Sequence, residues 1–212
     1  MNSFPITFAC LLILTCEGSA EQRNTLECSF FSNDVDPDLA ELQPRGLCAY
    51  ELNGRIFVSH SALHKLSVPA QGLASINVEG HGWYFVRPDG STIASIPWEN
   101  GPDDFVEGLA RYTEGGKVGF IDTMGNIAIK AQYQHASQFS NGHAVVCNGC
   151  TNVSDGEHTF LKGGSWGCID KNSSIVFPVE YSETEIHKKL DQLNRKDSGQ
   201  QSHGADGGNA DR

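Results

Sequence analysis

Residues 117–125 (KVGFIDTMG) and 165–173 (SWGCIDKNS) decide the fold of this chain, because the two segments align residue for residue. A third and more divergent copy spans residues 82–90 (GWYFVRPDG). Each copy is a run of apolar and small residues that ends in a turn sequence, and in two of the copies a glycine supplies the positive φ of a tight turn. We therefore expect each copy to form a strand followed by a sharp turn.

The copies belong to longer units that repeat along the chain. The units begin at Gly72, Gly108 and Gly142, so their spacing is 36 and then 34 residues, within the range typical of repeat architectures. Each unit has the pattern of a β-hairpin or meander, and one such unit cannot bury its apolar face alone. The sequence thus predicts a mainly β domain of tandem repeats over residues 70–181. The positions expected to form its repeat core are Trp83, Phe85, Phe120, Ile121, Trp166 and Gly167.

The two well-aligned copies, each preceded by an FVEGLA or FSNGHA segment, resemble WG repeats, a β-repeat family rich in bacterial members and named for its Trp-Gly pair. Trp166 and Gly167 keep this pair, whereas Val118 replaces the Trp in the second unit and Tyr84 replaces the Gly in the first. The resemblance covers residues 70–181, and the VCNGC, DGEH and WGCID segments make it more specific, toward secreted, uncharacterised WG-repeat proteins of proteobacteria. It implies all-β repeat units, a role in protein binding at most, and no assigned catalytic residue.

The third unit carries an insertion that is rich in cysteine. From the leading glycine to the Trp position the chain runs 10 residues in the second unit and 24 in the third. The inserted segment contains Cys147, Cys150 and His158, and Cys168 follows on the next predicted strand. A disulfide that staples the inserted loop is the favoured interpretation, and it would add about 2–4 kcal/mol.

Two other interpretations of these cysteines stay open. The alternative cofactor is zinc, held in a Cys₃His site by Cys147, Cys150, His158 and Cys168, since the C-x-x-C spacing permits such a site. A redox pair of Cys147 and Cys150 is the least favoured, because no helix N-terminus lies behind the first cysteine.

The amino-terminal segment predicts export. Residues 6–15 are an apolar run of ten, too short to span a bilayer, and Gly18-Ser19-Ala20 follows it. We expect residues 1–20 to be a signal peptide and the protein to be periplasmic or extracellular. A lipoprotein anchored at Cys16 ranks second, because Thr15 stands where Gly or Ala is usual.

Removal of this segment leaves an odd number of cysteines. The five that remain are Cys28, Cys48, Cys147, Cys150 and Cys168. Thiols outside the cytoplasm tend to pair, so all five are disulfide candidates. Because five is odd, at least one of them has no partner of this kind within the chain.

Two flanking segments complete the predicted organisation. We expect residues 21–69 to form an amino-terminal segment with a solvated acidic part at 21–43 and a short helix near 60–66. We interpret His60 and His64 of this helix as surface histidines, because no third metal ligand accompanies them. Residues 182–212 comprise a helix over 183–196 and a disordered tail from 197.

The net charge and the absence of common catalytic motifs limit the classes of function that the sequence supports. The 212 residues carry 15 Lys and Arg against 26 Asp and Glu, for a net charge of −11, which argues against nucleic acid as a partner. The sequence has no G-x-S-x-G, H-E-x-x-H or phosphate-loop motif. Asp122 and Asp170 occupy equivalent turn positions, which indicates turn capping rather than acid–base catalysis.

These observations predict a non-catalytic protein whose repeats present a binding surface to a protein or to a component of the cell envelope. No transmembrane segment and no cofactor are expected. The alternative is a zinc-binding or thiol-active protein centred on the cysteine cluster of the third unit.

Overall fold

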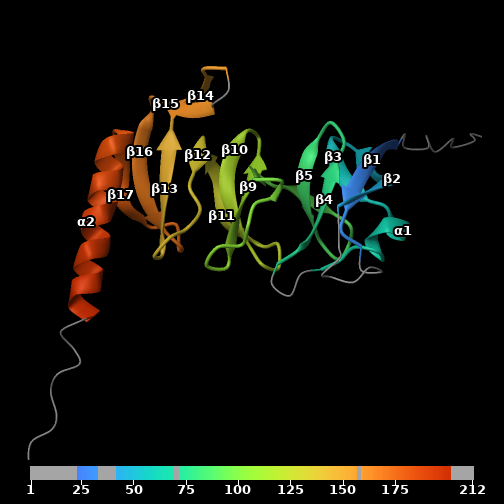
Figure 1. Ribbon diagram of the computed structural model, residues 1–212, viewed down its shortest axis with the longest axis horizontal. Coiled ribbons are helices and arrows are strands. Elements are labelled where there is room, and N and C mark those ends of the chain that lie inside the picture. The colour runs from blue at the N-terminus through green and yellow to red at the C-terminus, as the bar shows by residue number, and fades with distance from the viewer. Residues whose placement is uncertain (1–22, 33–41, 69–71, 157–158, 202–212) are drawn as a thin grey trace, which may run out of the picture.

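Antiparallel sheets follow one another along the chain and along the long axis of the molecule (Figure 1). The computed structural model describes residues 23–32, 42–68, 72–156 and 159–201. Its elements are mostly strands, which confirms the predicted mainly β fold. The predicted signal peptide and Cys16 lie outside the described residues.

The first sheet has six strands in the order β3-β2-β1-β4-β5-β6. Their bounds are β1 Asn24–Phe30, β2 Gln43–Leu52, β3 Arg55–Val58, β4 Ala74–Val78, β5 Gly82–Val86 and β6 Thr92–Ala94. The first repeat therefore supplies half of this sheet, and the residues before it supply the other half.

The second repeat forms a sheet of three strands, in the order β11-β10-β9. Strand β12, from the end of the second unit, joins three strands of the third repeat in a sheet of four, in the order β12-β13-β16-β17. Their bounds are β9 Leu109–Glu114, β10 Lys117–Asp122, β11 Ile127–Tyr133, β12 His135–Ala136, β13 His143–Asn148, β16 Ser165–Asp170 and β17 Ile175–Tyr181. A small hairpin of β7 Pro97–Trp98 and β8 Gly101–Pro102 lies between β6 and β9 along the chain, and another, of β14 Thr151–Ser154 and β15 Thr159–Lys162, lies between β13 and β16. The second hairpin is the predicted insertion.

The expectation of a solvated segment over residues 21–43 is wrong for β1. This strand lies inside the first sheet, paired with β2 on one side and β4 on the other. Cys28 and Phe30, two positions apart on the strand, both face the core and are 4% and 1% exposed. The acidic residues that follow β1 make the whole segment polar on average, which hides this strand in the sequence. The acidic residues 34–38 lie outside the described residues.

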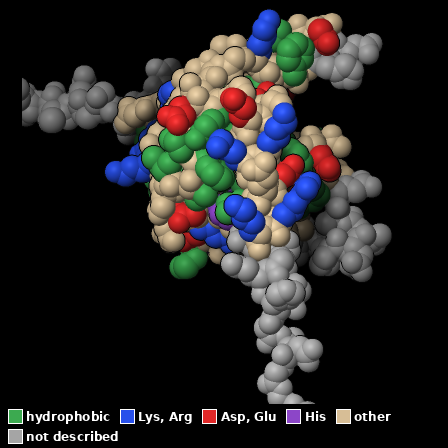
Figure 2. Space-filling model, turned by 90° about the vertical axis from the view of Figure 1, so that its left-hand side faces the viewer, with side chains coloured by type: hydrophobic (Ala, Val, Ile, Leu, Met, Phe, Trp, Pro, Cys, Tyr) green, Lys and Arg blue, Asp and Glu red, His purple; other side chains and the backbone are tan. Residues whose placement is uncertain are grey.

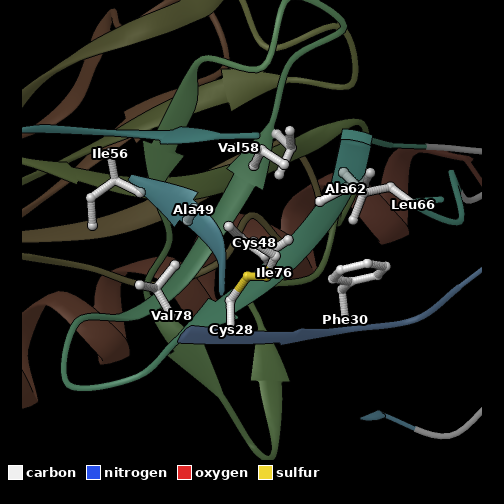
Figure 3. Packing of buried hydrophobic residues seen from close by; sticks show 12 residues of the cluster. Cys28, Phe30, Cys48, Ala49, Ile56, Val58, Ala62, Leu66, Ile76 and Val78 are labelled. Atoms are coloured by element: carbon white, nitrogen blue, oxygen red, sulfur yellow. A yellow bond between two sulfur atoms is a disulfide. The ribbon is translucent and has the colours of Figure 1, made fainter. Parts of the chain in front are cut away.

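The core of the first sheet joins the residues before the repeats to the first repeat (Figure 3). A disulfide links Cys28 of β1 to Cys48 of β2. Phe30 packs in the same cluster as Ile76 and Val78 of β4, both of which are fully buried. Since β3 and β4 belong to one sheet, the boundary expected near residue 70 falls between strands that share a core.

A β-bulge explains the glycine of the Trp-Gly pair. In the second repeat Val118 pairs with Tyr133 but Phe120 pairs with Ile129, so β11 carries extra residues opposite Gly119. A Cβ on Gly119 would lie 2.5 Å from the carbonyl oxygen of Ile129. The bulged strand thus approaches β10 so closely that a side chain has no space there.

The other two repeats support this explanation. In the third repeat the pairing of β16 with β17 shifts in the same way around Gly167, where a Cβ would lie 2.8 Å from the carbonyl oxygen of Phe177. In the first repeat Tyr84 occupies the glycine position, and it pairs in regular register with Ala94 of β6. The glycine is present where the partner strand is bulged and absent where it is regular.

Two helices, α1 His60–Leu63 and α2 Glu183–Gln201, lie at the two ends of the row of sheets (Figure 1). Ser59 caps α1 by accepting a hydrogen bond from the backbone N–H of Ala62 at 3.3 Å. Helix α2 packs on the third sheet through Ile186, which is fully buried. It continues past residue 196 to Gln201, which corrects the predicted start of the tail; residues 197–201 contain no proline that would end a helix.

Figure 2 faces the α2 end of the molecule and shows basic, acidic and apolar side chains interspersed over it. Within the described part of the chain, neither helix is both long and apolar enough to cross a bilayer.

Candidate functional site

A groove of about 310 Å³ lies where the first sheet meets the second. An isolated bridge joins Ser95, which follows β6, to Tyr112 of β9. On the groove side of this bridge, β6 and the residues 113–114 of β9 are not paired with each other and instead line the groove. The groove therefore lies at the junction of the first two repeats, and residues of β2, of β3 and of the turn between them complete its lining.

The groove presents charges of both signs. Its polar lining includes Glu51, Arg55, His81, Tyr84, Arg87 and Glu114. Burial raises the pKa of Tyr84, and the carboxylate of Glu51 adds to this effect. The Tyr84 hydroxyl therefore stays protonated near neutral pH and can both donate and accept a hydrogen bond.

Arg87 fixes one wall of the groove to the second repeat. Its Nη2 and Nε atoms donate to the carbonyl oxygen of Gly125, at 2.9 and 3.3 Å. Gly125 ends the turn between β10 and β11, so this contact joins the β5–β6 turn of one repeat to the equivalent turn of the next. The sequence offered one signal of this role, since Arg87 aligns with the turn residues Asp122 and Asp170.

A buried ion pair fixes the second repeat between its neighbours. Asp103 and Arg111 form this pair, with 2.6 Å between Oδ1 and Nη2 and side-chain exposures of 0% and 6%. The other carboxylate oxygen of Asp103 accepts the backbone N–H of Arg111 at 2.7 Å and its Nε–H at 3.0 Å. Gln138, which leads into the third repeat, donates to Asp103 at 3.0 Å.

Further contacts complete this network. Arg111 donates to the carbonyl oxygen of Ala136 at 3.1 Å, and its guanidinium lies 5.4 Å from the ring centroid of Trp98. Burial, together with the positive charge of Arg111, lowers the pKa of His135. These partners satisfy the buried charges from three segments at once, so the pair acts as a structural junction between repeats.

A second junction links the turns of the second and third repeats. Lys171 Nζ lies 2.8 Å from Glu107 Oε2 and donates to the Glu107 carbonyl oxygen at 3.1 Å. The same carboxylate accepts the backbone N–H of Gly142 at 3.1 Å. The hydrogen bond from Lys171 is the largest influence on the pKa of Glu107 and holds it below its usual value.

The aspartates at the turn positions act on their own backbone, as the turn interpretation predicts. Asp122 accepts the N–H groups of Met124 and Asn126 at 2.9 and 2.8 Å, and Asp170 accepts the equivalent N–H groups of its turn. The N–H of Ser174 is the main reason why the pKa of Asp170 is lowered. For Asp122 partial burial opposes the shift, and hydrogen bonds from Asn126 and its neighbours outweigh it and lower the pKa.

The predicted cysteine cluster lies in the third repeat. Cys147 and Cys150 are joined by a disulfide across the turn that follows β13, while Cys168 is a buried free thiol on β16. Burial, and to a lesser extent the charge of Asp170, raises the pKa of Cys168 to about 11. His158, the fourth candidate zinc ligand, lies outside the described residues, and the described ones contain no cluster of three His, Cys, Asp or Glu suited to a metal.

The repeat-core positions are buried. Trp83, Phe85, Phe120, Ile121 and Trp166 are each at most 9% exposed. The Trp166 indole also donates to the carbonyl oxygen of Gly163 at 3.0 Å, which ties the insertion to the repeat.

Residues 119–149 and 166–185 match the family model described as "WG containing repeat". The match supports a WG-repeat protein. The first matched segment begins at Gly119 opposite the bulge of β11 and ends after β13, and the second begins at Trp166 and ends within α2. Both matched segments thus include a glycine at the Trp-Gly position and the bulged strand that it faces. Comparisons with curated proteins and with solved structures found no match.

Proposed function

We propose that the chain is an exported, non-catalytic WG-repeat protein that binds a protein or a component of the cell envelope in the groove between its first two repeats. The observation that carries the proposal is the groove itself, which places acidic, basic and hydroxyl groups along one junction. Such a mixture suits a polar partner that offers both charges or many hydrogen-bond groups, because each charged group in the groove can be matched.

The use of the buried and turn carboxylates supports a role without catalysis. Asp122 and Asp170 are occupied by backbone N–H groups, and Asp103 is occupied by Arg111. A carboxylate that acts as a general acid or base must be able to exchange protons with a substrate, and these three carboxylates are already engaged in hydrogen bonds within the fold.

Export is supported by the disulfides and by the amino-terminal sequence. The Cys28–Cys48 and Cys147–Cys150 bridges suit an oxidising compartment. The apolar run at residues 6–15, followed by small residues, suits a cleaved signal peptide. The resemblance to secreted proteobacterial WG-repeat proteins leads to the same proposal.

Affinity capture with charge-reversed baits tests the proposed groove. Immobilised wild-type chain is compared with Arg55→Glu, which reverses an exposed groove charge, and with Lys162→Glu, which reverses an exposed charge on the insertion hairpin. We expect wild-type and Lys162→Glu to retain the same envelope component, and Arg55→Glu to retain at least about tenfold less. Equal retention by all three baits would contradict the groove as the binding site.

A further inference from the structure

Two histidine side chains converge on the exposed surface of α1. His60 begins this helix and His64 is its C-cap, one turn later. Both residues are exposed. Their Nε2 atoms are 3.1 Å apart, and the two rings stand nearly perpendicular, at 87°, with centroids 4.4 Å apart.

This separation matches the bite of a metal chelate. An imidazole nitrogen binds a divalent transition-metal ion at about 2.0–2.1 Å. Two nitrogens that are 3.1 Å apart and both lie at that distance from one ion enclose an angle of about 98° at the ion. This angle falls between the right angle of square-planar or octahedral coordination and the wider angle of a tetrahedron, so one ion can bind both rings without large movement.

We propose that His60 and His64 form a bidentate site for a divalent transition-metal ion. Nitrogen ligands favour Cu²⁺ over Zn²⁺ and Ni²⁺ at a site of this kind. The described residues offer no third protein ligand in a cluster with the two histidines, so water completes the coordination. Binding replaces the present Nε2–Nε2 contact, because both nitrogens then direct a lone pair to the ion.

The segment that carries the two rings is fixed before any ion binds. The backbone N–H of Ser59 donates to the carbonyl oxygen of Cys48 in β2 at 2.9 Å, next to the Cys28–Cys48 disulfide. Ala62 and Leu66 anchor the same segment in the core of the first sheet, at 5% and 4% exposed. Since little backbone ordering is required, the second imidazole adds to the affinity through its high local concentration.

This arrangement goes beyond what the sequence indicated. The spacing alone places the two histidines on one face of a helix, and without a third ligand they resemble any pair of surface histidines. The structure adds the convergence of the two nitrogens and the anchored segment beneath them. If one ion binds both converging nitrogens, the loss of either histidine removes the chelate, whereas two independent surface histidines would lose affinity separately.

Copper titration of the tag-free chain tests the site. Cu²⁺ binding is measured by calorimetry and by electron paramagnetic resonance for the wild type, His60→Gln, His64→Gln and the double variant. The control is His187→Gln, an exposed histidine on α2. We expect each single substitution to weaken the tightest Cu²⁺ site by at least about tenfold, with the double variant no weaker than either single one.

The spectra provide a second readout. We expect the coupling pattern of two equatorial nitrogens in the wild type and of one in each single variant, with the wild-type pattern kept in His187→Gln. Circular dichroism verifies that the glutamine variants remain folded, which the exposure of both side chains leads us to expect. Small additive losses at His60 and His64, or an unchanged tightest site in the double variant, would overturn the proposal.

Discussion

Substitution of Gly119 by alanine tests how strands β10 and β11 of the second repeat pack together. The added Cβ would lie 2.5 Å from the carbonyl oxygen of Ile129 and 2.6 Å from the backbone nitrogen of Ala131, whereas ordinary contacts are 3.4 Å or longer. Both of these obstacles are backbone atoms of β11, so no side-chain rotation can relieve the clash. The bulged strand would have to move away from β10.

The magnitude follows from two effects. Overpacking of a well-packed interior costs about 1–3 kcal/mol. Movement of β11 also breaks the hydrogen bond from the Ala131 N–H to the Tyr112 hydroxyl, 3.1 Å long, and the loss of this partly buried bond costs about 0.5–1.5 kcal/mol more. Because part of the strain relaxes as the strand moves, we expect Gly119→Ala to lower the free energy of unfolding by about 2–4 kcal/mol.

Urea denaturation followed by tryptophan fluorescence measures this loss. The matched control is Gly101→Ala, because a Cβ there meets only the Trp98 carbonyl oxygen at 3.9 Å and the backbone needs no positive φ. We expect the control to stay within about 0.5 kcal/mol of the wild type. If Gly119→Ala were no less stable than Gly101→Ala, the explanation of the glycine at position 119 by the close approach of β11 would be refuted.

Three further predictions concern the charges and the free thiol. Asp103→Asn should reduce the free energy of unfolding by about 3–5 kcal/mol in the same assay, because it leaves the buried Arg111 charge without its partner; a loss below about 1 kcal/mol would contradict the junction. Cys168 should resist iodoacetamide in the folded chain, because its thiol is buried and unpaired and has a raised pKa, and it should react after unfolding without reductant. Peptide mass mapping measures the labelling, and labelling in the folded chain would contradict this expectation. The folded-state pKa of Glu107 lies below its unfolded value, so the stability it gains from Lys171 is present above the unfolded pKa and lost as the pH falls through the folded pKa. Glu107→Gln should therefore flatten the fall in melting temperature between about pH 5 and pH 3, and an unchanged slope would count against that contact.

Much of the architecture is visible in the sequence because it depends on local signals. The recurring glycine turns and the loosely alternating apolar residues predict the meanders, and either Ser59 or Ser61 could cap the short helix expected near residues 60–66, of which the structure uses Ser59. Strand β1 escaped prediction because its apolar residues, such as Cys28 and Phe30, stand beside a strongly acidic stretch that lowers the mean hydropathy. The place of β1 in the middle of a sheet depends on pairing with β4, some 50 residues away, which no local pattern encodes.

The candidate site was harder to predict because it arises between units. Strands on both sides of the junction between the first two repeats line the groove, and the lining residues share no sequence motif. Asp103 and Arg111 are eight residues apart, and no motif in the sequence pairs them. Their burial depends on Gln138 and Ala136, which the stacking of the third repeat brings to them. Repeat spacing predicts that units stack, but it does not predict which side chains meet.

Site-specific photo-crosslinking in intact cells shows what binds in the groove between the first two repeats. A photoreactive phenylalanine analogue replaces Thr113 in the groove or Thr151 on the insertion hairpin as a control. We expect a discrete crosslinked species from Thr113 that is absent from Thr151 and is lost when Arg55→Glu is introduced. No crosslink from Thr113, or the same species from both positions, would contradict a binding groove between the first two repeats.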